Sequence, residues 1–150
     1  SQRRKARDIK QAVDLQSNSL AQAIVEDYFA RVDFDARLKV LQRFYRRRAH
    51  QLAEAVARVL PSWQFDFPDG GFSLWVKTDA IVDETRFLAR AIDEGVSFDI
   101  GSAFTRRRPA GPNFLRLCFS AERPARFLTG VERLARAWRW AVKSAKARAT

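Results

Sequence analysis

One arginine lies inside an otherwise apolar stretch, the segment NFLRLCFS over residues 113–120. Because successive side chains of a strand point to opposite faces, Arg116 is expected to share a face with Phe114 and Cys118 and to oppose the leucines. A charge in such a place is costly unless it reaches water or meets an anion. The planar guanidinium suits a carboxylate, which it holds by two parallel hydrogen bonds. From the residues alone, a structural salt bridge or an edge-strand arginine is the commoner case, and a ligand site is the alternative.

The sequence shows no complete catalytic or metal-binding set of residues. It has one histidine, His50, and one cysteine, Cys118, and nothing marks them as a pair. His50 has no second ligand-like residue beside it, so no metal site is expected. A single cysteine fits a reducing cytoplasm, and no apolar run reaches the roughly 20 residues that a membrane helix needs. We therefore expect a cytoplasmic protein with neither catalytic residues nor a metal of its own.

The hydrophobic pattern predicts four helices and four strands around Arg116. The helices are expected over 14–32, 35–60, 83–94 and 124–145, with Asp35 as an N-cap and Gly95 in a left-handed C-terminal position. The strands are expected over 63–67, 72–76, 96–100 and 114–119. Trp75 is expected in or near the core, and the polar residues 2–10 are expected to be loose. This order predicts an α+β fold, in which long helices pack on one face of a short, mostly antiparallel sheet.

The net charge of +11 is uneven, because the basic excess lies within 34–60 and 121–150. Such a field can attract nucleic acid, although a solvated basic helix face is the commoner case. Arg106, Arg107 and Arg108 make the loop before residue 113 basic as well. The sequence does not decide whether that loop favours an acidic substrate or is simply solvated.

Four blocks in order resemble one known family. They are PDGGFSLWV (68–76), EGVSFDIGSAF (94–104), NFLRLCFS (113–120) and GVERL (130–134). They are similar to the C-terminal small domain of fold-type I pyridoxal-phosphate aminotransferases, above all the 2-aminoadipate type and the GntR-family transcriptional regulators with a fused aminotransferase-like domain. The resemblance covers roughly residues 9 to 140. One departure is Ile100, where the family usually has proline before the glycine.

The resemblance implies a role for Arg116, namely binding of the substrate α-carboxylate, with Asn113 as a second substrate-binding candidate. It also implies pyridoxal phosphate in a longer parent protein. The Schiff-base lysine block, the aspartate for the pyridine nitrogen and the phosphate cup are not found here, so the chain alone is expected to hold no cofactor and to be inactive. Residues 1–33 are then a linker and helix that follow an absent N-terminal large domain, and 34–150 are the small domain. The chain contains no methionine, which also fits a piece of a longer protein.

Several alternatives remain open at this stage. The parent is expected to be a homodimer that acts on amino acids and 2-oxo acids, either as an enzyme or as a regulator that binds DNA through a separate upstream domain. A different class of function is a standalone basic module for nucleic acid or for protein interaction. The sequence does not give the substrate specificity.

Overall fold

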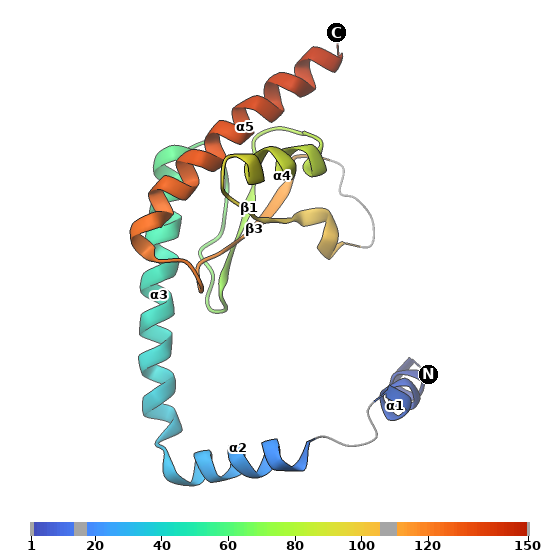
Figure 1. The fold of residues 1–150 in the computed structure, drawn as a ribbon, viewed down its shortest axis with the longest axis vertical. Helices are drawn as coiled ribbons and strands as arrows, with labels where there is room; N and C mark the ends of the chain where they lie inside the picture. Colours follow the sequence, from blue (N-terminus) through green and yellow to red (C-terminus); the bar gives the residue numbers. More distant parts are fainter. Residues whose placement is uncertain (1, 14–17, 106–110, 150) are drawn as a thin grey trace. The chain divides into compact units, whose positions relative to one another are not determined.

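The computed structural model describes residues 2–13, 18–105 and 111–149. The chain divides into two compact units, Ser1–Leu41 and Gln42–Thr150 (Figure 1). The helix α3 (Phe34–Val59) begins in the first unit and continues into the second. The expected boundary between residues 33 and 34 concerns a longer parent protein and stays a prediction.

The described residues of the first unit are mostly helical. This unit holds α1 (Gln2–Val13), α2 (Ser19–Arg31) and the beginning of α3. The side chain of Asn18 caps α2 by accepting a hydrogen bond from the amide of Ala21 at 3.1 Å. The expectation of a loose arm over residues 2–10 is therefore wrong: arginine, lysine, glutamine and alanine favour a helix intrinsically even where no apolar stripe is present. The first residues of the helix predicted over 14–32, residues 14–17, lie outside the described residues.

The N-cap of α3 is Asp33, and the prediction of Asp35 is wrong. The Oδ1 atom of Asp33 accepts a hydrogen bond from the amide of Ala36 at 2.9 Å, three residues further on. Asp35 instead lies in the first turn of the helix. Both aspartates precede the same apolar stripe, and helix ends are uncertain by one or two residues in any sequence-based prediction.

The second unit is built on a three-stranded antiparallel sheet in the order β1-β3-β2. Its strands are β1 (Ser73–Lys77), β2 (Asp99–Ile100) and β3 (Phe114–Cys118). The strand predicted over 63–67 is reduced to a single bridge, in which Gln64 and Lys77 exchange backbone hydrogen bonds of 2.9 and 2.7 Å. Pro68, which has no amide hydrogen, follows this segment directly and gives it no further pairing.

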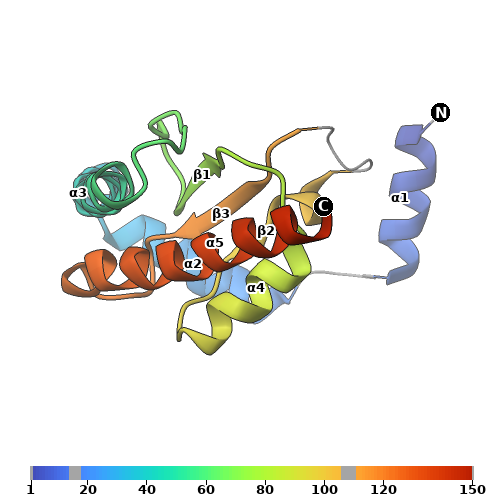
Figure 2. The ribbon, with the colours of Figure 1, turned by 90° about the horizontal axis from the view of Figure 1, so that it is seen from above.

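The remaining elements of this unit are helical. They are α4 (Glu84–Asp93), the short 3-10 helices η1 (Gly101–Phe104) and η2 (Pro124–Arg126), and α5 (Phe127–Ala149). Asp83 caps α4 by accepting hydrogen bonds from two amides of the first turn, and Gly95 follows the helix with a φ of +78°, as predicted. Helices α4 and α5 lie side by side (Figure 2).

One face of the sheet is buried and carries the core. Its inward side chains join residues of α3, α4 and α5 in one hydrophobic cluster, whose most buried members include Val56, Leu74, Val76, Phe87, Leu115, Phe119 and Leu134. The α+β fold with long helices on one sheet face is thus confirmed. The apolar stripe of α3 enters this core only in its second half, since Leu52 and Val56 are buried whereas Leu38 and Leu41 are exposed.

A buried arginine connects α3 to the end of β3. Helical spacing puts Arg48 on the polar side of the helix expected over 35–60, but in the structure it is only 8% exposed. Its Nε donates to the carbonyl of Phe119 at 2.6 Å, and its Nη2 donates to the carbonyl of Glu122. The guanidinium also lies near the rings of Phe44 and Phe127. Arg48 therefore fixes the chain just beyond the strand that carries Arg116.

Candidate functional site

Three side chains form a row across the open face of the sheet. Trp75 of β1 and Asp99 of β2 are the direct cross-strand neighbours of Arg116 in β3. The leucines on either side of Arg116 are buried, whereas Arg116 itself is exposed. The predicted alternation along this strand is confirmed, and it leaves the guanidinium on the face opposite the core.

Arg116 is paired with a carboxylate in this structure. Its Nε lies 3.0 Å and its Nη2 lies 2.9 Å from the same oxygen, Oδ2 of Asp99. The two side chains remain 44% and 49% exposed, so the pair is accessible to solvent. An exposed ion pair of this kind contributes little to stability. Arg116 therefore both reaches water and meets an anion, the two conditions under which a charge is tolerated in such a strand.

An aromatic ring covers the guanidinium of Arg116. The Cζ atom of Arg116 lies 4.7 Å from the centre of the Phe104 ring. The ring of Trp75 meets Phe104 edge-on at 5.6 Å and stacks on Phe114 at 5.8 Å. Trp75 is itself 40% exposed, so the prediction that it is a core anchor is wrong. Its buried neighbours in β1 point to the opposite face, which is the consequence of the same two-residue alternation.

Phe104 reaches this position because the chain passes very close to β3 at Gly101. A Cβ atom on Gly101 would lie 2.6 Å from the Cβ and 2.7 Å from the backbone oxygen of Phe114. Only glycine fits such an approach without a shift of the backbone. The short helix η1 starts at this glycine and ends at Phe104. Close packing against β3 therefore explains the glycine at residue 101.

Asn113 lies beside the site, but its side chain faces the fold. It is 7% exposed. Its Oδ1 accepts from the amide of Val82 at 2.7 Å, while its Nδ2 donates to the carbonyl of Val82 and to Oε1 of Glu84, each at 3.1 Å. The backbone oxygen of Asn113 accepts from both the amide and the hydroxyl of Thr78. Asn113 thus joins the start of β3 to the start of α4, and its amide is occupied by these contacts.

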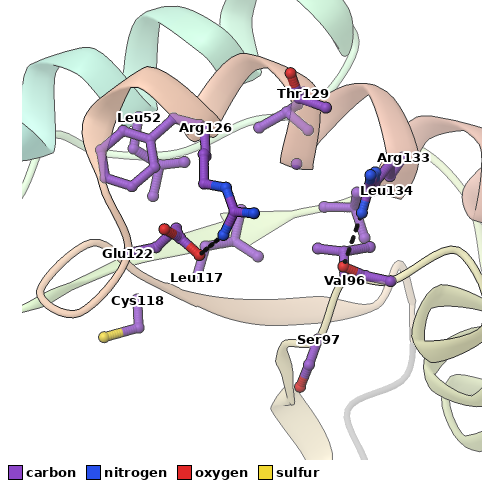
Figure 3. A pocket seen from close by; sticks show the side chains of 14 residues that line it. Leu52, Val96, Ser97, Leu117, Cys118, Glu122, Arg126, Thr129, Arg133 and Leu134 are labelled. Carbon is purple, nitrogen blue, oxygen red and sulfur yellow. Dashed lines mark hydrogen bonds and ion pairs between the residues drawn. The ribbon is translucent and has the colours of Figure 1, made fainter.

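Two cavities adjoin the sheet. One, of about 390 Å³, is lined by residues that include Trp75, Gly101, Asn113 and Phe114 and is therefore next to the aromatic side of the row. The other, of about 440 Å³, is lined by Leu52 of α3, by the segment 95–97 after α4, by the end of β3 and by the first turns of α5 (Figure 3). Arg116 is not among the lining residues of either cavity, and neither is any lysine of the described residues.

Charged groups at the rim of the larger cavity make contacts with other groups of the chain. Arg126 and Glu122 form an ion pair of 3.3 Å, and Nη1 of Arg133 lies 3.5 Å from the carbonyl of Gly95 (Figure 3). Partial burial raises the pKa of the nearby Cys118 thiol, but hydrogen bonds from Ser120 and Ser73 outweigh it, so the pKa lies below its ordinary value. These contacts account for the polar rim without a ligand.

Metal and membrane sites were also expected to be absent. Within the described ranges, no group of three or more histidine, cysteine or acidic side chains is placed to hold a metal ion. His50 stacks on the ring of Phe67 at 4.2 Å. Each helix of the described residues is too short or too polar to cross a bilayer. The basic loop of Arg106 to Arg108 lies outside the described residues.

Known proteins are similar to this chain in sequence and in fold, although no family model matches the chain. It is 29% identical over 133 residues to aromatic-amino-acid aminotransferase 1 of Thermococcus litoralis, which covers 88% of this chain and 32% of that protein. It also superposes on the α-aminoadipate aminotransferase LysN of Thermus thermophilus, complexed with N-(5'-phosphopyridoxyl)-L-leucine, with a TM-score of 0.79 and 28% identity over 91% of this chain and 35% of that one. The chain is similar to fold-type I aminotransferases. The resemblance predicted from its four blocks is confirmed.

Two further comparisons limit what this similarity says. The chain spans about a third of the length of these aminotransferases. It is also 25% identical over 114 residues to the uncharacterized HTH-type transcriptional regulator YdfD of Bacillus subtilis, which covers 75% of this chain and 23% of that protein. The chain is therefore similar in sequence both to aminotransferases and to a transcriptional regulator.

The sequence analysis missed two residues of the site, Asp99 and Phe104. Both belong to the block EGVSFDIGSAF, which was used only as a family signature. A signal was present, because a lone aspartate in one strand and a lone arginine in another form a favourable cross-strand pair if they are in register. The register between the two strands was not predictable from either segment alone.

Proposed function

We propose that this chain is the C-terminal small domain of a pyridoxal-phosphate-dependent aminotransferase or of an aminotransferase-like GntR-family regulator, and that Arg116 binds the α-carboxylate of its amino-acid or 2-oxo-acid ligand. One observation carries the proposal. In a chain similar to aminotransferases, the arginine is held half-exposed on the open sheet face, where it already binds the carboxylate of Asp99. A guanidinium that binds one carboxylate while exposed to solvent has the geometry to bind a second one.

The residues around Arg116 do not fit pyridoxal phosphate by themselves. No lysine of the described residues lines either cavity next to the sheet, so no amine is placed to form an imine there. We propose that the cofactor is held by a large domain that precedes residues 1–33, and that the complete protein is a cytoplasmic homodimer. In this proposal residues 34–150 supply only the carboxylate-binding side of the site.

Asn113 takes a positioning role in this proposal. Its amide makes three hydrogen bonds to Val82 and Glu84 inside the fold. It therefore holds β3 against α4 and acts on a ligand through the strand that carries Arg116. A direct contact between Asn113 and the ligand would require these bonds to break.

The comparisons include two kinds of parent protein, an enzyme and a transcriptional regulator. The reading frame upstream of Ser1 distinguishes them, because a winged-helix region there indicates a DNA-binding regulator and its absence indicates an enzyme. The alternative class of function is a standalone module that binds nucleic acid or another protein. The aminotransferase relatives favour the first class, since they match most of this chain.

Arg116 can be tested in the chain itself. Pyruvate is titrated against the ¹⁵N-labelled protein while the backbone amide signals of residues 113–118, which every variant retains, are followed by NMR, with neutral pyruvamide as the matched ligand. Because the expected contact is one ion pair in solvent, the Kd should be on the order of millimolar. Arg116→Ala should weaken binding of pyruvate at least about tenfold, whereas Arg126→Ala, at another exposed arginine, should leave it unchanged. Equal binding of pyruvate by the Arg116→Ala variant would contradict the proposed function.

A further inference from the structure

The geometry points to Asp99 and Phe104 as positioning residues, which fix the guanidinium of Arg116 so that its end edge, Nη1 and Nη2, is presented to a carboxylate ligand. This inference rests on the proposed function, because it concerns how the same arginine is prepared for its ligand. It assigns a role to two residues that touch Arg116 from different directions, one at an edge and one on a face.

A guanidinium offers two edges that can hold a carboxylate. The side edge consists of Nε and Nη2, and the end edge consists of Nη1 and Nη2. Asp99 occupies the side edge, since its Oδ2 lies 3.0 Å from Nε and 2.9 Å from Nη2. Among the described residues, Nη1 of Arg116 donates no hydrogen bond. The end edge is therefore left for a ligand while Asp99 stays in place.

Phe104 restricts the same group in a second direction. Its ring lies 4.7 Å from Cζ of Arg116 and covers one face of the guanidinium. The ring is braced by Trp75, which meets it edge-on at 5.6 Å. Its backbone is anchored through η1 by the close approach of Gly101 to Phe114. A cation over an aromatic face is attracted to it, so the ring holds the plane of the guanidinium as well as its position.

These contacts matter because a long arginine side chain otherwise loses its conformational freedom only when the ligand binds. Holding the group in its binding orientation beforehand reduces that cost and increases affinity. The exposed ion pair adds little to the stability of the fold, so its main effect is on orientation. The cross-strand register of Asp99 and Arg116 sets this orientation from the backbone.

Asp99 also carries a negative charge, which opposes the approach of an anionic ligand. Two substitutions separate this effect from positioning. Asp99→Asn and Asp99→Ala both remove the charge, but only asparagine keeps an oxygen that can accept from Nε of Arg116. The difference between these two variants therefore measures orientation alone.

The experiment is a titration of pyruvate against the complete 150-residue chain and its variants, followed by the backbone amide signals of residues 113–118, which every variant retains. Asp99→Asn should bind pyruvate at least as tightly as the unsubstituted chain. Asp99→Ala should bind about tenfold more weakly than Asp99→Asn, the loss that corresponds to one orienting hydrogen bond to a charged group. Rotation about the Cζ–Nη bonds should be slow in the chain and in Asp99→Asn, and fast in Asp99→Ala.

A second variant tests the ring. Phe104→Leu keeps an apolar side chain of similar bulk but removes the aromatic face, and it should bind pyruvate several-fold more weakly with an unchanged circular dichroism spectrum. If Asp99→Ala and Asp99→Asn bind equally, or if Phe104→Leu binds as tightly as the unsubstituted chain, the positioning role is overturned. The proposed function still stands in those cases if Arg116→Ala abolishes binding. If Arg116→Ala binds normally, the proposed function itself fails.

Discussion

Gly101 approaches Phe114 so closely that a Cβ atom would lie 2.6 Å from the Cβ of Phe114. Gly101→Ala should therefore force the backbone apart and lower the free energy of unfolding by about 1–3 kcal/mol, the usual cost of overpacking. It should also move Phe104 away from Arg116, because η1 begins at Gly101. Urea denaturation measures the first effect, and the Arg116 Nε–H chemical shift measures the second.

Gly130 provides the matched control for this substitution. It lies inside α5, and a Cβ atom there meets nothing within 4 Å. Gly130→Ala should raise the free energy of unfolding by about 0.5–1 kcal/mol, since alanine is the better helix former. Equal stability changes in the two variants would show that the close approach at Gly101 is not a constraint.

Arg48 is expected to be the most important arginine for stability among those of α3. Arg48→Ala removes donors from the carbonyls of Phe119 and Glu122 in a buried place, and it should lower the free energy of unfolding by about 2–4 kcal/mol. The adjacent Arg47 is exposed, so Arg47→Ala should change it by less than about 0.5 kcal/mol. Chemical denaturation gives the free energy of unfolding of both variants. Similar free energies for Arg48→Ala and Arg47→Ala would mean that the Arg48 side chain is solvated in solution.

The sequence was sufficient to predict the fold but only part of the site. Alternation of leucine with other residues placed Arg116 on the open face, and helical spacing located α3, α4 and α5. The same alternation indicates that Trp75 faces away from Leu74 and Val76. The prediction that Trp75 lies in or near the core conflicts with this alternation, and it was wrong. For the helix predicted over 83–94, helical spacing likewise predicts Ile92 on the inward side, but in α4 this residue is exposed.

The pairing of Arg116 with Asp99 was beyond what the sequence could establish. It depends on the register between β2 and β3, which the chain between them sets. The burial of Arg48 was hidden for a similar reason. Its partners are two backbone carbonyls more than 70 residues away in the chain, and backbone groups leave no trace in a side-chain pattern.

Asn113 offers a test between positioning and direct ligand contact. Asn113→Ala should lower the free energy of unfolding by about 2–4 kcal/mol, because the amide and carbonyl of Val82 both lose a buried partner. Asn113→Asp should be more damaging, since it places a second carboxylate about 3.1 Å from Glu84. Thermal denaturation shows which of the two variants is less stable. Folded Asn113→Ala protein should still bind pyruvate, and a specific loss of binding without loss of stability would show direct contact.

Glu94 should make the stability of the second unit depend on acid pH. A hydrogen bond from Arg136 is the main cause that lowers the pKa of the Glu94 carboxyl, and Arg90 lowers it further. The Oε2 atom lies 2.9 Å from Nε of Arg136, and Oε1 lies 2.6 Å from Nη2 of Arg90. Because the pKa is lower in the folded chain than in the unfolded one, this contribution is complete above the ordinary value of 4.5 and is lost as the pH falls through the folded value.

The measurement is the Tm from pH 6 down to pH 3, taken by circular dichroism. Glu94→Gln removes the titrating group, so its Tm should be lower at pH 6 and should fall less steeply with acid than that of the unsubstituted chain. Glu54 is an exposed glutamate of α3 without an ion pair among the described residues, and Glu54→Gln is the matched control for the loss of one carboxylate. Since Glu94 joins α4 to α5 through Arg136, parallel curves for Glu94→Gln and the unsubstituted chain would mean that this helix pair is held by its apolar contacts alone.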